Sequence, residues 1–273
     1  MKAAGPTAAR ASSAPRPGSR PDHPLCIAHR GASARAPENT LAAFKEAIDL
    51  GADAIELDVH LSADAVPMVI HDDSVDRTTN GRGLVSALTC RSLRRLDAGA
   101  WFSSRFRGER IPTLEEALEC ARGRCGLNIE IKEPGGGRGR GGRARGTGAS
   151  GPGAVPRAVA GALARTGFKE PLIVSSFSTR ALRQARAAMP DVNMGFLASR
   201  SLRGLRALHR RVGLYAVHPH VRLATARRVR LAHRLGLLVL FWTVNEARLM
   251  RRLLALGGDG LMTDDPAIFR DLR

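Results

Sequence analysis

From residue 25 onward, short apolar runs with the length of buried strands alternate with segments of helical periodicity. The eight runs span 25–29, 54–59, 127–131, 172–176, 192–197, 214–217, 237–242 and 260–263. This alternation predicts an α/β fold in which eight parallel strands close into a (β/α)8 TIM barrel. The 273 residues fit one such barrel, since barrels of roughly 250 residues routinely form a single domain.

Helix signals occupy the intervals between the runs. Asn39 or Thr40 can cap a helix through Leu50, and the sequence TLEE at 113–116 is a capping box that opens a helix through about Ala121. Further helices are expected at roughly 156–166, 179–189, 200–211, 223–235 and 245–256. Asn245 is expected to cap the last of them.

One strand-like run, 66–70, breaks the alternation because it begins too soon after residue 59 for a parallel crossover. It therefore predicts an antiparallel hairpin after the second strand, with a turn near Ala63 and Asp64. Paired residue numbers that sum to about 127 would place His71 beside Glu56 or, after a small slip, beside Asp58.

We expect a single domain at 23–273 with three irregular segments around or within it. Residues 1–22 are rich in Ala, Pro, Arg and Ser, lack the apolar core of a secretory signal, and predict a disordered basic tail. Residues 72–112 form a small insertion. Residues 134–156 form a flexible Gly/Arg-rich loop, either a basic flap that attracts anionic substrate or a neutral expansion.

The formal net charge of +18 raises the question of a nucleic-acid partner. Arginine supplies 39 of the 43 cations and is spread over helix faces and low-complexity segments, while aromatic residues make up only 4%. We therefore expect solvated arginines and no specific nucleic-acid partner. The longest apolar run is far shorter than the ~20 residues of a transmembrane helix. A cytoplasmic protein is expected, and its oligomeric state stays open.

Ionisable residues collect where the predicted strands end. Glu56 and Asp58 are two residues apart, so both face the barrel interior, and Glu130 and Lys132 repeat this spacing on the next strand. Buried carboxylates are costly unless they are paired or bind metal, and three converging ones suit one Mg²⁺ or Ca²⁺ rather than zinc. Of the other histidines near strand ends, His60 is interpreted as a surface or supporting residue, and His218 and His220 as a structural turn or as residues that touch substrate.

Several motifs strengthen this interpretation. They are HRG at 29–31, PENT at 37–40, GADAIELDV at 51–59, HDD at 71–73, RTTNG at 77–81, LDAGAWF at 96–102, IPTL at 111–114, NIEIK at 128–132, WTVN at 242–245 and DGLMTD at 259–264. Together they make the sequence resemble the glycerophosphodiester phosphodiesterases, members of the phosphatidylinositol-phospholipase-C-like barrel superfamily. One departure is Ala65, where the family usually has a turn glycine.

The resemblance implies roles for individual residues. His29 and His71 correspond to the general acid/base pair, although in some relatives the second histidine lies near the metal. The divalent-metal ligands correspond to Glu56, Asp58 and Glu130. The substrate-binding residues would be Arg30 and Lys132 for phosphate and Trp242 for the glycerol pocket.

The expected activity is metal-dependent hydrolysis of small-molecule glycerophosphodiesters to sn-glycerol 3-phosphate and an alcohol, a reaction of lipid and glycerol metabolism. One alternative is a lysophospholipase D that uses the same residues on a substrate with one acyl chain. The other is a basic nucleic-acid-binding protein on a barrel scaffold, which the histidine and carboxylate set argues against.

Overall fold

The computed structural model describes residues 21–133, 151 and 153–272. The expected basic tail at 1–22 and the expected loop at 134–156 therefore lie largely outside the described residues. Residues 154–156 are an exception, because they already belong to a helix, so the loop boundary at 156 is wrong.

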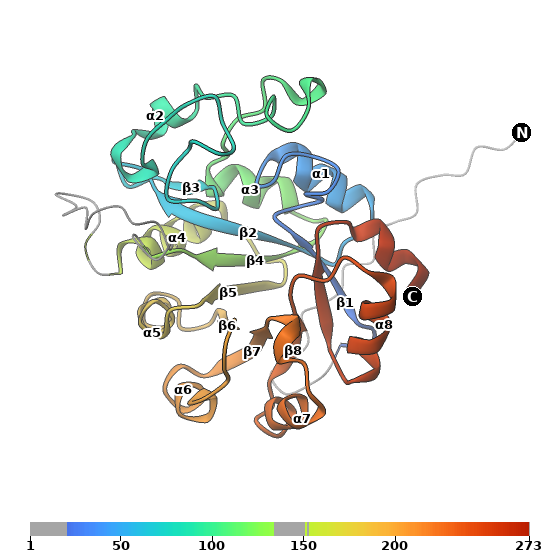
Figure 1. Cartoon of the computed structure of the whole chain (residues 1–273). Helices are drawn as coiled ribbons and strands as arrows, with labels where there is room; N and C mark the ends of the chain where they lie inside the picture. Colours follow the sequence, from blue (N-terminus) through green and yellow to red (C-terminus); the bar gives the residue numbers. More distant parts are fainter. Residues whose placement is uncertain (1–20, 134–150, 152, 273) are drawn as a thin grey trace, which may run out of the picture.

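The eight expected parallel strands close into a barrel, which confirms the TIM-barrel prediction (Figure 1). They are β1 (Leu25–His29), β2 (Ala54–Leu61), β4 (Gly126–Ile131), β5 (Leu172–Ser176), β6 (Asn193–Ala198), β7 (Leu214–Pro219), β8 (Leu238–Phe241) and β9 (Gly260–Thr263). The chain of parallel pairings runs from β1 through β9 to β2, and the additional pairing of β1 with β2 closes it. Apolar side chains such as Ile27, Leu240 and Met262 fill the interior, so the barrel is a packed core rather than a pore.

Helices surround this barrel between successive strands (Figure 1). They are α1 (Leu41–Asp49), α3 (Leu114–Ala121), α4 (Ala154–Thr166), α5 (Thr179–Ala188), α6 (Leu205–Val212), α7 (Ala226–Arg234) and α8 (Ala247–Ala255). Thr40, not Asn39, caps α1, and the capping box of Thr113 and Glu116 forms as expected. The expected Asn245 cap of α8 is wrong: Glu246 holds the cap position, because the Asn245 side chain bonds Thr263 and Asp264 instead.

The hairpin forms, but its register differs by one residue from the expectation. In β3 (Pro67–Val69), Val69 pairs with Val59, where the expected register pairs Met68 with it. The difference arises from a three-residue loop that ends on Ala65 at φ 61°, a left-handed conformation that favours glycine. The ladder ends at Val69, so His71 pairs with neither Glu56 nor Asp58; the Ile70 amide donates to the Asp58 carbonyl oxygen instead.

Strand β2 has two successive neighbours along one edge. Its first residues, Ala54 to Glu56, pair with β1, and its last, Val59 to Leu61, pair with β3. The expected strand end at residue 59 was therefore two residues too early, and His60 lies within β2. On this edge, β2 therefore changes its neighbour from β1 to β3 around Asp58.

The segment that follows β3 carries a small core of its own. It contains α2 (Cys90–Leu93) and the 3-10 turns η1 (Val85–Ala87) and η2 (Ser104–Phe106). Its buried side chains are Met68, Ile70, Val75, Val85, Leu93, Ala98 and Ile111, a cluster separate from the main core. Two further 3-10 turns, η3 (Val221–Leu223) and η4 (Pro266–Leu272), follow β7 and β9. Among the described residues, no helix is long and apolar enough to cross a membrane.

Candidate active site

The loop after β1 brings backbone and side chains toward the mouth of the barrel. Arg30 adopts a left-handed conformation at φ 57°, followed by Gly31 at φ 84°. A β-carbon on Gly31 would lie 2.7 Å from the Ala43 backbone, so this position requires glycine and lets the loop pack on α1. The Arg30 amide then donates to Glu56 Oε2 at 3.0 Å.

Three carboxylates meet inside the barrel, as the sequence spacing predicts. The register places Glu56 opposite Asn128 and Asp58 opposite Glu130, so all four side chains share the inner face of β2 and β4. The carboxylate oxygens of Glu56, Asp58 and Glu130 lie within 4.8 Å of one another, and all three residues are buried. We call these three residues the acidic cluster.

Cations and amides hold the acidic cluster in place. Lys132 Nζ lies 2.9 Å from Asp58 Oδ1 and 2.6 Å from Glu130 Oε1, and Arg30 Nε lies 3.4 Å from Asp58 Oδ2. Asn39 adds two bonds to Asp58, one to its carboxylate and one from its backbone amide. Burial opposes ionisation of Asp58, but Lys132 and Arg30 outweigh it and lower its pKa.

The pKa values of the other two acids are raised, because burial and repulsion among the three carboxylates both oppose ionisation. Burial, followed by the charges of Asp58 and Glu130, raises the pKa of Glu56 well above its ordinary value. Burial also raises the pKa of Glu130 to about 7, although Lys132 opposes the shift. A divalent cation would relieve this repulsion, and oxygen ligands are those that Mg²⁺ and Ca²⁺ prefer. The residues present therefore fit a divalent metal.

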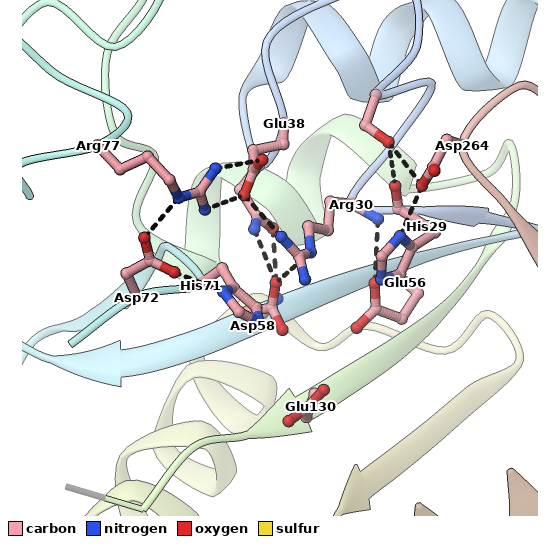
Figure 2. Close-up of polar contacts among 12 residues, drawn as sticks. His29, Arg30, Glu38, Glu56, Asp58, His71, Asp72, Arg77, Glu130 and Asp264 are labelled. Carbon is pink, nitrogen blue, oxygen red and sulfur yellow. Dashed lines mark hydrogen bonds and ion pairs between the residues drawn. The ribbon is translucent and has the colours of Figure 1, made fainter. Parts of the chain in front are cut away.

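Two histidines lie on either side of the acidic cluster, each bonded through Nδ1 to a carboxylate (Figure 2). His29 pairs with Glu56 across β1 and β2, and its Nδ1 lies 2.7 Å from Asp264 Oδ1. His71 lies on the Asp58 side, and its Nδ1 is 2.7 Å from Asp72 Oδ1. A carboxylate at Nδ1 holds the proton there, so in each ring Nε2 is the atom free to exchange a proton.

Further bonds position these histidines. Asp264 accepts from Ser33 at 3.1 Å and from Asn245 at 2.5 Å. His60 is buried rather than on the surface, and it bonds the His71 carbonyl oxygen through Nε2 at 3.1 Å, which agrees with the supporting role. Burial lowers the pKa of His71, so its neutral form is favoured.

The aromatic residues lie at the same end of the barrel. Trp242 follows β8, donates from Nε1 to the His218 carbonyl oxygen at 2.7 Å, and contacts His220 and Phe177 edge to face. His218 is fully buried within β7, and burial lowers its pKa to about 3, so its part is structural.

Sequence reasoning missed four charged residues that surround the site: Glu38, Asp72, Arg77 and Asp264. Arg77 bonds both Asp72 and Glu38, and Glu38 also bonds Arg30. All four lie within the motifs quoted above, in PENT, HDD, RTTNG and DGLMTD. The available signal was an ionisable side chain inside each motif.

Comparison with known proteins decides which family combines this barrel with this site. Residues 29–268 match the Glycerophosphoryl diester phosphodiesterase family. The chain belongs to this family. It is therefore an enzyme, a phosphoric diester hydrolase of the glycerophosphodiester phosphodiesterase class.

Individual members of the family support the same assignment. The chain is 39% identical over 243 residues to a glycerophosphodiester phosphodiesterase of Caldanaerobacter subterraneus subsp. tengcongensis, a match that covers 89% of this chain and 94% of that protein. It is 31% identical to the glycerophosphodiester phosphodiesterase of Bacillus subtilis over 93% of this chain and 87% of the relative. Among solved structures, an Oleispira antarctica phosphodiesterase in complex with the product sn-glycerol-3-phosphate matches with a TM-score of 0.81 and 31% identity, over 91% of this chain and 96% of the other.

Proposed function

We propose that this phosphodiesterase hydrolyses glycerophosphodiesters to sn-glycerol 3-phosphate and an alcohol, with one Mg²⁺ or Ca²⁺ held by Glu56, Asp58 and Glu130. The observation that carries the proposal is the placement of His29 and His71 on two sides of the acidic cluster, each with a carboxylate at Nδ1. The product bound to the similar Oleispira antarctica structure supports the choice of substrate.

The two histidines would move protons in opposite directions. In the first step, His29 Nε2 takes the proton of the glycerol 2-hydroxyl, whose oxygen forms a bond to phosphorus. The bond from phosphorus to the leaving alcohol oxygen breaks, and the protonated form of His71 gives its Nε2 proton to that oxygen. The product is a cyclic glycerol phosphate. In the second step, His71 takes a proton from water, which opens the ring, and His29 returns a proton to the 2-hydroxyl. Each such transfer contributes about 10²–10⁴ to the rate.

Charged groups would bind the phosphodiester. A bound divalent cation supplies Lewis-acid stabilisation of charge on the phosphoryl oxygens. Arg30 and Lys132 already face the acidic cluster. Each carries several N–H donors and would hold the other phosphate oxygens. Trp242 would form a wall for the glycerol arm. These roles rest on the family resemblance and on the positions of the side chains.

Release of glycerol 3-phosphate from a panel of glycerophosphodiesters, with and without chelator, tests the proposal. EDTA should abolish activity, and Mg²⁺ or Ca²⁺ should restore it. His29→Ala and His71→Ala should each lose at least about 10²-fold in kcat with the fold intact. Turnover near that of the wild type in either variant would contradict the acid/base assignment, and indifference to EDTA would contradict the metal site.

Exposed apolar side chains favour a second candidate, a lysophospholipase D. Leu84 and Trp101, in the segment after β3, and Phe177, after β5, are each more than two-fifths exposed. An acyl chain could contact such residues. Comparing hydrolysis of glycerophosphocholine with that of lysophosphatidylcholine separates the two candidates. The cytoplasmic location, the lack of a nucleic-acid partner and the single domain at 23–273 stay predictions.

A further inference from the structure

Arg77 is the one arginine of the HDD-to-RTTNG segment (71–81), and its guanidinium bonds two carboxylates from different parts of the chain. Its Nε donates to Asp72 Oδ2 at 2.6 Å. Its two terminal nitrogens donate to the two oxygens of Glu38 at 2.9 and 2.8 Å. Asp72 follows β3, whereas Glu38 lies in the loop between β1 and α1 (Figure 2).

Each of these carboxylates also bonds a residue of the candidate active site. The second oxygen of Asp72 lies 2.7 Å from His71 Nδ1. Glu38 Oε1 accepts from the Arg30 guanidinium at 2.8 Å. One guanidinium therefore connects, through two acids, the histidine on one side of the acidic cluster with an arginine that contacts Asp58.

We propose that Arg77 is a positioning residue that holds His71 through Asp72 and Arg30 through Glu38. A planar guanidinium offers donors in a fixed fork and can bond two carboxylates at once, which the point charge of lysine cannot reproduce. Without it, Asp72 and Glu38 would face each other with no cation between them and would repel. Both would then move, and His71 and Arg30 would move with them.

The ionisation of the two acids agrees with this geometry. Burial opposes ionisation of Asp72, but bonds from Arg77 and His71 lower its pKa to about 2. Burial likewise opposes ionisation of Glu38, and Arg77 and Arg30 lower its pKa. Both side chains are therefore full acceptors at neutral pH.

The inference rests on the proposed function. Two substrates with different leaving groups separate the positioning role of Arg77 from the general-acid role of His71. If His71 protonates the leaving alcohol, its position matters for choline, a poor leaving group, and little for p-nitrophenol, which departs without a proton. The substrates are therefore glycerophosphocholine and the p-nitrophenyl ester of glycerol 3-phosphate. The variants are Arg77→Met, Arg77→Lys and His71→Ala. Arg82→Met is the matched control, because Arg82 directly follows this segment, is 89% exposed and approaches Asp76 at 3.9 Å.

We expect Arg77→Met to lose at least about tenfold in the single-turnover rate of choline release from glycerophosphocholine and less than about threefold in that of p-nitrophenol release, the pattern of His71→Ala in weaker form. This rate reports the first step alone, whereas kcat also includes the second step, in which His71 takes a proton from water with either substrate. KM should rise by a similar factor on both substrates, because Arg30 would contact the phosphate that they share. Arg77→Lys should show the same pattern with a smaller loss, and it carries the test if the methionine variant does not fold. Arg82→Met should stay within about twofold of the wild type.

The outcomes separate the two claims. If the loss in His71→Ala depends on the leaving group but the Arg77 variants lose equally on both substrates, or retain the wild-type rate of alcohol release, the positioning role is overturned. If His71→Ala and the Arg77 variants all lose equally on both substrates, the positioning of His71 stands and its assignment as general acid is overturned.

Discussion

The Nδ1 atom of His29 lies 2.7 Å from Oδ1 of Asp264, although 235 positions separate the two residues in the chain. The contact exists because β1 and β9 are neighbours in the closed barrel, so residues that follow their carboxyl ends meet. Asp264 is half-buried, and burial opposes its ionisation, but the bond to His29 outweighs this and lowers its pKa. An ionised Asp264 keeps the His29 proton on Nδ1 and leaves Nε2 able to accept one.

Replacing Asp264 by Asn should therefore damage the chemical step more than substrate binding. The amide can donate to Nδ1, which would place the ring proton on Nε2, the wrong nitrogen for a base. We expect kcat to fall by about 10²-fold or more with KM nearly unchanged. Steady-state kinetics on a glycerophosphodiester measure both. Ser33→Ala, which removes a 3.1 Å bond to the same oxygen, is the control and should lose less than about tenfold.

Lys132→Met should make the protein more dependent on metal for its stability. Lys132 is the ion-pair partner of both Asp58 and Glu130, and removing one member of a buried ion pair costs about 3–5 kcal/mol. Mg²⁺ or Ca²⁺ should bind the variant more tightly, because a competing cation is gone, and should raise its Tm more than that of the wild type. Thermal melts in EDTA and in excess metal measure this. An equal metal-induced shift in the two proteins would count against the cluster as the metal site.

Metal affinity should rise with pH up to about 7. The pKa of Glu130 is raised to about 7 by burial, from an ordinary value near 4.5. In the metal-free protein, the stabilising contribution of this group is therefore full below pH 4.5 and is lost as the pH rises to about 7. Metal binds the ionised acid, so affinity should gain about tenfold per pH unit for each proton released in that window.

Calorimetric titration of Mg²⁺ or Ca²⁺ between pH 5.5 and 8 measures this dependence. In Glu130→Gln, which has no proton to release at this position, the slope should fall by about one proton. An affinity that does not change with pH across the window would show that the acids are already ionised in the metal-free protein.

Gly195→Ala should destabilise the barrel from inside. A β-carbon at Gly195 would lie 2.7 Å from Cε1 and Nε2 of His218, whose ring is fully buried. Overpacking of this kind costs about 1–3 kcal/mol. The matched control is Gly161→Ala in α4, where the nearest atoms belong to the flexible end of Arg165 and the helix should gain up to about 1 kcal/mol. Urea unfolding of the two variants should therefore shift in opposite directions, and a Gly195→Ala variant as stable as the wild type would contradict the packing argument.

The sequence was sufficient to predict the features that follow from strand periodicity. Alternation of strands and helices predicts the barrel, and the two-residue spacing of Glu56 with Asp58, combined with the parallel register, predicts that Glu130 joins them. Both inferences depend only on which face of a strand a side chain occupies. That is why they are confirmed.

Features that depend on loops could not be predicted in the same way. The hairpin register was wrong by one residue because Ala65 takes a conformation rare for alanine. The Asn245 cap was wrong because a better partner, Asp264, arrives from a different loop. Asp264 and Arg77 were missed as site residues for the same reason, since nothing in their local spacing reveals which distant group they bond.

The change of neighbours along β2 has a mechanical consequence. Strand β2 is continuous: its first residues pair with β1 and close the barrel, and its last residues pair with β3, which leads into the segment that has its own small core. Asp58 lies between these two pairings, and on this edge of β2 its amide donates to the side chain of Asn39. The backbone of Asp58 thus bonds both the Asn39 side chain and the Ile70 amide, while its carboxylate bonds Lys132. Because Asp58 belongs to the acidic cluster, a displacement of the segment after β3 would pass along β2 to that cluster.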